Sequence, residues 1–139
     1  MIRGFLVAAI FAGAVQAAAP REVKLGAALP LSGAESKSGG RLRDGYDLGV
    51  DLANQQGGVE IGGVHVPVKL TLVDDKSDGA TDERAVEDLV NQGTDLILGT
   101  FGSSLVEKGS AVSEKLHVPY VAATPTSKAA WRSAECTSR

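Results

Sequence analysis

The chain has 139 residues, of which 43% are hydrophobic and 4% aromatic, and its formal charge at pH 7 is -3. This length suits one domain of ordinary size, and the slightly negative charge gives no electrostatic reason to expect binding to nucleic acid or to an acidic membrane surface. A single cysteine excludes a scaffold held together by internal disulfides, so the stability must come from an apolar core.

The first residues have the pattern of a secretory signal peptide. Arg3 supplies a positive charge, residues 5–15 are almost wholly apolar, and Gln16 and three alanines follow before Pro20. The apolar run is shorter than the roughly 20 residues that a membrane-spanning helix needs. We therefore expect residues 1–17 to be a cleaved signal peptide, although a cut after Ala18 would also fit.

The first half of the remaining chain alternates between strand and helix patterns. A short strand is expected at residues 22–30, followed by a serine- and glycine-rich loop at residues 31–40. From Arg41 to about Asn54, apolar residues recur every three or four positions, which predicts an amphipathic helix. Glycine pairs then flank residues 59–61 and predict a small hairpin.

The same alternation continues in the second half. Three more strands are expected, at residues 66–73, 96–98 and 118–123. One intervening helix is expected to be capped by Asp78 or Thr81 and closed by Gly93, and the other is expected at residues 105–116.

This order of elements predicts an α/β fold with a partial doubly wound parallel sheet. Strands that alternate with helices are joined by right-handed crossovers, and the helices cover both faces of the sheet. Ligands bind such sheets outside the carboxyl ends of the strands. Three loops should meet there, at residues 30–40, 99–104 and 124–128, and all three are rich in Ser, Thr and Gly. Their convergence is the main functional signal.

Two adjacent serines stand where the third helix is expected to begin. Ser104 and Glu107 match the S-x-x-E capping box, so Ser104 is expected to cap the helix. One cap is enough, which leaves Ser103 as either a loop residue or a ligand contact. The partial positive charge of a helix N-terminus favours a carboxylate or another anion as the ligand.

The motifs expected of a nucleotide-binding or hydrolytic enzyme are missing from the sequence. There is no G-x-G-x-x-G, no G-x-x-x-x-G-K-[ST] and no G-x-S-x-G. No cluster of cysteine and histidine suggests a metal. We therefore expect no catalytic residue, no cofactor and no metal.

Two histidines and two aspartates are further candidates for chemistry. Neither His65 nor His117 is expected to activate Ser103, and His117 is expected to interact with carbonyls at a helix C-terminus. Asp74 and Asp75 could grip a ribose, but without a glycine fingerprint a solvated turn with a helix-capping role is favoured.

Five stretches together carry a family resemblance: "VKLGAALPLSG", "GYDLGVDLANQQGGV", "VKLTLVDDKSD", "AVEDLVNQGTDLILGTFGSS" and "VPYVAATPTS". In this order and spacing the chain resembles, from residue 23 to 131, the N-terminal portion of the type I periplasmic substrate-binding proteins. The resemblance is to the branched-chain amino acid (Leu/Ile/Val) branch that serves ABC importers. It implies that residues 18–139 form part of the N-terminal lobe of a two-lobed protein.

The resemblance also implies a set of ligand-binding residues. Ser103 and Thr126 match the family's serine and threonine that anchor the ligand, and the carbonyl of Pro125 stands where the family receives an ammonium group. Ser38 falls where some members place an aromatic residue over the ligand side chain. Ser104, which is adjacent to Ser103, is a further candidate ligand-binding residue.

The function implied is that of a periplasmic, non-enzymatic solute-binding component of an ABC importer. Its partners would be the permease subunits, and its ligand an amino acid or a similar small carboxylate. Because members of the family have a second lobe, the chain is expected to be a fragment that binds weakly alone. The alternatives are the extracellular ligand-binding domain of a sensor and an exported α/β hydrolase that uses Ser103.

Overall fold

Six strands and three helices alternate along residues 22–124, which are the residues that the computed structural model describes. The strands are β1 (Val23–Leu29), β2 (Val59–Ile61), β3 (Val64–Val66), β4 (Val68–Asp74), β5 (Leu96–Leu98) and β6 (Tyr120–Val121). The helices are α1 (Ser36–Gln55), α2 (Gly79–Asn91) and α3 (Ser103–Lys115).

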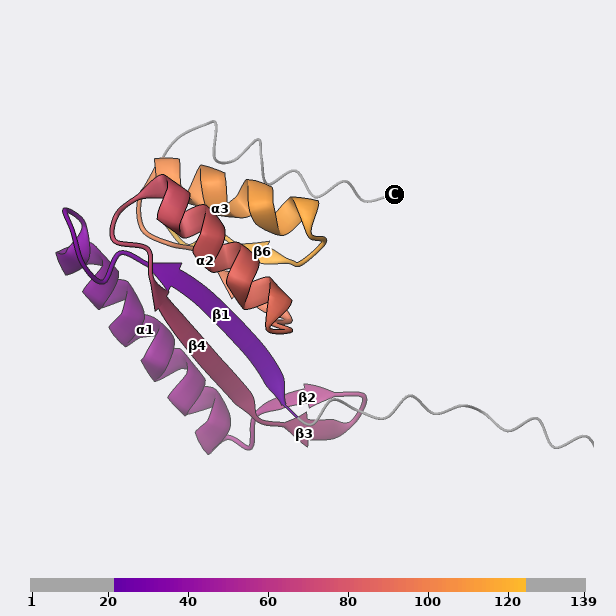
Figure 1. Cartoon of the computed structure of the whole chain (residues 1–139). Helices are drawn as coiled ribbons and strands as arrows, with labels where there is room; N and C mark the ends of the chain where they lie inside the picture. Colours follow the sequence, from indigo (N-terminus) through magenta and orange to yellow (C-terminus); the bar gives the residue numbers. More distant parts are fainter. Residues whose placement is uncertain (1–21, 125–139) are drawn as a thin grey trace, which may run out of the picture.

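The main sheet has four parallel strands in the order β4-β1-β5-β6. β1 pairs with β4 along its whole length, from Val23 opposite Val68 to Leu29 opposite Asp74. Helix α1 covers one face of this sheet, while α2 and α3 lie together on the other (Figure 1). The predicted α/β architecture is therefore confirmed, and the carboxyl ends of the parallel strands meet at one edge.

The centre of the core lies between the sheet and α2. Its buried apolar side chains are Ala28, Ala85, Val86, Leu89 and Ile97. The three that α2 contributes recur at one- and three-residue steps, as the amphipathic pattern predicts. Several polar residues are buried as deeply as this core, among them Asp75, Asp82 and Thr100.

Helix α1 begins at Ser36, five residues before the predicted start at Arg41. The early start depends on Gly39, because a Cβ on this residue would collide with the backbone carbonyl oxygen of Pro30. Glycine therefore lets the first turn of α1 lie directly against the end of β1. The local propensity of glycine and serine is not helical, so the sequence of this segment predicts a loop instead.

The predicted strand at residues 66–73 is divided into β3 and β4 by Pro67. A proline has no N–H to donate, so it interrupts the ladder at this point. The predicted hairpin is confirmed: β2 and β3 pair antiparallel and form a separate two-stranded sheet. The last strand, β6, is shorter than the prediction of residues 118–123.

Within residues 22–124, none of the helices has the length and apolar character needed to cross a membrane. The predicted signal peptide at residues 1–17 lies outside the described residues.

Candidate functional site

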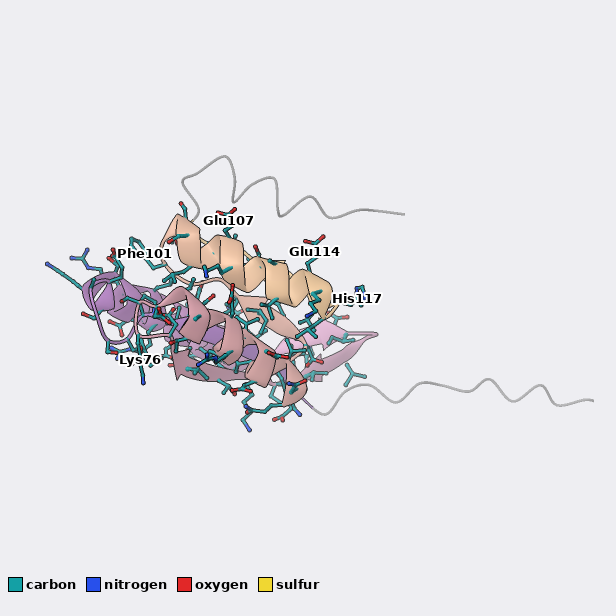
Figure 2. The ribbon with its side chains drawn as sticks, turned by 45° about the horizontal axis from the view of Figure 1, so that its top comes forward. Lys76, Phe101, Glu107, Glu114 and His117 are labelled. Carbon is teal, nitrogen blue, oxygen red and sulfur yellow. The ribbon has the colours of Figure 1, made fainter. Side chains whose placement is uncertain are left out.

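Three loops of the described region leave the carboxyl ends of neighbouring strands. They are residues 30–35 after β1, residues 75–78 after β4 and residues 99–102 after β5. Lys76 and Phe101, which belong to two of these loops, emerge at the same end of the molecule (Figure 2). The first and last of them were predicted to form the site, and the parallel sheet brings them to one edge.

Ser103 is the first residue of α3, and the preceding Gly102 is the N-cap with a φ of 97°. A positive φ of this size is readily adopted by glycine, which allows the chain to turn sharply from the loop into the helix. Ser103 is half-buried and lies within the first turn of α3. The N–H groups of a helix's first turn carry the positive end of the helix dipole, so the position suits an anion.

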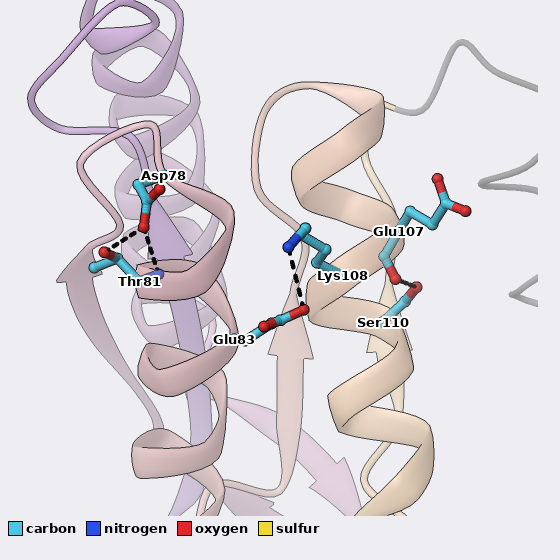
Figure 3. A network of polar contacts seen from close by, with 6 residues as sticks. All are labelled: Asp78, Thr81, Glu83, Glu107, Lys108 and Ser110. Atoms are coloured by element: carbon cyan, nitrogen blue, oxygen red, sulfur yellow. Dashed lines mark hydrogen bonds and ion pairs between the residues drawn. The ribbon is translucent and has the colours of Figure 1, made fainter.

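The prediction that Ser104 caps α3 is wrong. The helix starts before Ser104, its N-cap is Gly102, and no side chain caps this helix through a hydrogen bond. The carbonyl of Gly102 accepts the first helical hydrogen bond, from the Val106 N–H at 3.0 Å. Ser104 therefore lies inside the helix, where its side chain is exposed. The backbone carbonyl of Glu107 accepts a hydrogen bond from Ser110 one turn later (Figure 3).

The loop that leads to Ser103 is held from several sides. The Tyr46 hydroxyl of α1 donates to the Gly99 carbonyl at 2.6 Å, and burial raises the pKa of this tyrosine to about 12. The Thr100 hydroxyl donates to Oδ2 of Asp75 at 2.8 Å. The hydroxyl of Thr124 donates to the Thr100 carbonyl at 3.0 Å. These bonds fix the entry to α3 against α1 and β4, and no local sequence pattern predicts them.

Asp75 is fully buried, which corrects the prediction of a solvated turn. Burial raises the pKa of its carboxyl group, although hydrogen bonds from Thr100 and from the Ser77 N–H act in the opposite direction. Asp75 does not cap α2. The cap is Asp78, whose Oδ1 accepts a hydrogen bond from the Thr81 N–H at 2.8 Å (Figure 3). Of the two predicted caps, Asp78 and Thr81, the first is therefore confirmed.

Asp74 joins the loops after β1 and β4. Its carboxylate accepts hydrogen bonds from the N–H groups of Leu31, Ser32 and Lys76, and from the Ser32 hydroxyl at 2.7 Å. Burial acts to raise the pKa of Asp74, but these hydrogen bonds together lower it below its usual value. Lys76 and Ser77 both have left-handed backbone conformations, with φ of 58° and 59°. The short polar loop is thus tightly shaped, as is common beside functional sites.

Ser38 lies in the first turns of α1 and is half-buried. Because α1 follows β1 and α3 follows the adjacent strand β5, both helices begin at the same edge of the sheet. The fold therefore brings the starts of these two helices, with Ser38 and Ser103, to one end of the lobe. The predicted contacts Pro125 and Thr126 lie outside the described residues.

The histidines lie away from Ser103, as predicted. His65 belongs to the β2–β3 hairpin. His117 follows α3 with a φ of 58°, and its N–H donates to the Glu114 carbonyl. It stands at the opposite end of α3 from Ser103, roughly 20 Å away for a helix of this length (Figure 2). Among residues 22–124, no group of three or more His, Cys, Asp or Glu side chains is arranged to hold a metal ion.

Comparison with known sequences gives one matching family model, described as "Periplasmic binding protein", over residues 22–138. The Leu/Ile/Val-binding protein homolog 8 of Brucella abortus (strain 2308) is 33% identical over 103 residues, which are 74% of this chain and 25% of the relative. The homolog 8 of Brucella suis biovar 1 matches equally well. The chain thus spans about a quarter of the length of these curated relatives.

Solved structures give the same fold. The branched-chain amino acid transporter substrate-binding protein LivJ from Streptococcus pneumoniae, in complex with isoleucine, superposes with a TM-score of 0.72 at 25% identity. The match covers 80% of this chain and 31% of LivJ. A substrate-binding periplasmic protein from Ralstonia solanacearum superposes with a TM-score of 0.64 at 27% identity. This match covers 76% of this chain and 29% of the Ralstonia protein.

Proposed function

The chain belongs to the periplasmic binding protein family, and from this we propose that it forms part of the first lobe of a solute-binding protein that feeds an ABC importer. The family implies a place outside the cytoplasm. We further propose that residues 1–17 direct export to the periplasm, that residues 18–139 belong to the lobe, and that the permease subunits of the importer are its partners.

The ligand proposed is an amino acid or a similar small carboxylate. The observation that carries this proposal is the position of Ser103, in the first turn of α3 and at the carboxyl end of β5. A carboxylate placed there would be stabilised by the helix N-terminus and by a hydroxyl donor. The isoleucine bound to LivJ, a relative with the same fold, supports this choice of ligand class.

The remaining candidate residues are assigned by position. Ser38, at the start of α1, would face the ligand side chain, and a serine there leaves more room than an aromatic residue. Pro125 and Thr126 would hold the ammonium and carboxylate groups, and Ser104 would lie beside Ser103 on the exposed side of the first turn.

A calorimetric titration with L-isoleucine and L-glutamate tests the proposal. We expect Ser103→Ala to weaken binding by about 1–3 kcal/mol, the usual loss for a hydrogen bond to a charged group. L-Isoleucinamide, which lacks the carboxylate, is the matched control ligand, and its weak binding should not respond to the substitution. Unchanged affinity for the amino acids in Ser103→Ala would contradict the role of Ser103. Because the first lobe alone is expected to bind weakly, the titration uses the complete two-lobed protein, and a complete protein that binds no small carboxylate would contradict the ligand class.

A non-enzymatic role fits the relatives, whose names describe binding proteins and transporter components. The hydrolase alternative would require Ser103 to become acylated. Mass spectrometry after treatment with a serine-directed acylating probe separates the two functions, because a binding protein should leave Ser103 unmodified.

A further inference from the structure

Asp82 is a buried carboxyl group without a hydrogen-bond partner. It lies in the first turn of α2, its side chain is 1% exposed, and neither of its carboxyl oxygens has a partner within the described region. Asp75, the other buried aspartate of that region, accepts hydrogen bonds from Thr100 and Ser77. The sequence motifs and the proposed binding site do not account for Asp82.

The carboxyl group lies in the interface between α2 and α3. A Cβ added to Gly109 of α3 would be 2.7 Å from Oδ2 of Asp82, 3.3 Å from the Tyr120 hydroxyl and 3.4 Å from a methyl group of Val86. Glycine at position 109 thus allows α3 to approach α2 closely enough to cover the acid. The backbone of Gly109, a methyl group of Val86 and the Tyr120 hydroxyl therefore all lie near the carboxyl group.

The charged and titratable groups around Asp82 favour its neutral form. Asp75 comes from the end of β4, Tyr120 from β6 and Glu83 from α2 itself, and the two carboxylates oppose a further negative charge. Lys108 of α3 is the cation nearby, but its ammonium group pairs with Glu83 at 3.5 Å (Figure 3). Burial, and then the charge of Asp75, raise the pKa of Asp82 to about 8.

We propose that Asp82 makes the α2–α3 interface sensitive to pH: the interface is closed around the protonated carboxyl group and is loosened when this group ionises. An ionised carboxylate that is buried without a partner is strongly disfavoured, so the protein must hydrate it, pair it or separate the helices. Hydration or pairing with Lys108 requires α3 to shift relative to α2. Since α3 begins at Ser103, the same shift would displace the proposed ligand anchor, a consequence that rests on the proposed function.

The sign of the pH dependence follows from proton linkage. An aspartate in an unfolded chain has a pKa of about 3.9, whereas the native carboxyl group retains its proton up to about pH 8. Between these values the native state binds more protons than the unfolded state, so stability decreases as the pH rises. The contribution of Asp82 to the folding equilibrium constant falls about tenfold per pH unit over this window and levels off above pH 8.

Urea unfolding from pH 5 to pH 9 tests the proposal on the purified protein and on Asp82→Asn. Asparagine keeps the shape of the side chain and does not titrate. We expect the ratio of the wild-type folding constant to that of Asp82→Asn to fall about five-hundredfold between pH 5 and pH 8, because half of the carboxyl groups are already ionised at pH 8. Asp88→Asn, a change at an exposed position of the same helix, is the matched control and should keep the wild-type slope. Equal slopes for the wild type and Asp82→Asn would overturn the proposal.

A second measurement covers the case in which Asp82→Asn does not fold. The side-chain carboxyl carbon of Asp82 can be followed by carbon NMR in the wild-type protein. We expect the chemical shift of a protonated carboxyl group at pH 6 and a transition near pH 8. A carboxylate shift at pH 6 would refute the proposal without any variant.

The link to ligand binding is tested separately, by titration with L-isoleucine at pH 6 and pH 9. Weaker binding at pH 9 in the wild type, but not in Asp82→Asn, would support the link. Binding that is absent at both pH values counts against the proposed function, while the unfolding slopes and the NMR titration still decide the role of Asp82.

Discussion

The hydroxyl of Thr100 donates a 2.8 Å hydrogen bond to Oδ2 of Asp75, and both side chains are almost completely buried. This bond joins the loop that enters α3 to the end of β4, on the far side of β1 in the sheet order. The other carboxylate oxygen accepts from the Ser77 N–H at 2.7 Å. Asp75 is thus the central acceptor that holds two loops of the candidate site in a fixed relation.

Thr100→Val tests this role with a side chain of nearly equal shape. The variant removes one donor from a buried carboxyl group, so we expect the free energy of unfolding to fall by about 1–3 kcal/mol. Thr100→Ser keeps the hydroxyl and should recover most of that loss. Urea unfolding at pH 7 measures both variants. If the valine variant is as stable as the serine variant, the hydrogen bond contributes little to holding the loop.

Local patterns predicted the elements of this fold, because the core repeats at the periods of a strand and a helix. Leu96–Leu98 and the face of α2 are examples, and the cap at Asp78 uses residues only three positions apart. Most of the errors involve partners distant in sequence, but the error at Ser104 does not. The S-x-x-E pattern at Ser104 is local, but the start of α3 is decided by the turn at Gly102.

The site was predictable only in outline, for the same reason. The order of elements predicts that loops rich in Ser, Thr and Gly meet at one edge of the sheet. The burial of Asp75 depends on Thr100, which is 25 residues away, and the burial of Asp82 depends on the approach of Gly109. A charged residue in a polar stretch is predicted to be solvated unless the packing of the helices is known.

Gly39 and Gly45 offer a test of why α1 begins early. A Cβ at Gly39 would meet the carbonyl oxygen of Pro30, whereas a Cβ at Gly45 would meet nothing within 4 Å. We expect Gly39→Ala to destabilise the protein by about 1–3 kcal/mol, because the collision is with backbone that cannot turn aside. Gly45→Ala should instead stabilise α1 by about 0.5–1 kcal/mol through its higher helix propensity.

Thermal unfolding followed by circular dichroism measures both glycine variants. The two substitutions are of the same kind and lie in the same helix, but we expect Gly39→Ala to lower the stability and Gly45→Ala to raise it. A neutral effect of Gly39→Ala would show that the start of α1 does not depend on the close contact with Pro30, and destabilisation by Gly45→Ala would show that position 45 is not a free helix surface.

Asn54 fastens the C-terminal part of α1 to the sheet. Its side-chain amide donates to the Val68 carbonyl and accepts from the Val68 N–H, both at 2.8 Å. Asn54→Ala leaves two backbone groups at the beginning of β4 without these partners, so we expect a loss of about 1–2 kcal/mol. Amide hydrogen exchange provides a local readout, and the Val68 amide should exchange faster in the variant. Unchanged protection of that amide would mean that another group or water replaces the asparagine.

Asp74 should give the protein a pH dependence opposite in sign to that of Asp82. Its pKa is lowered in the native state because the hydrogen bonds from Leu31, Ser32 and Lys76 outweigh the effect of burial. The stabilisation is therefore present above the unfolded pKa of about 3.9 and is lost as the pH falls through the lower native value.

Asp74→Asn retains an acceptor at Oδ1 but no longer titrates. We expect it to cost about 1 kcal/mol at pH 7 and to reduce the loss of stability between pH 5 and pH 2, with the exposed Asp51→Asn in α1 as the control. Acid unfolding curves that coincide for the wild type and Asp74→Asn would show that the carboxylate charge does not hold the two loops together.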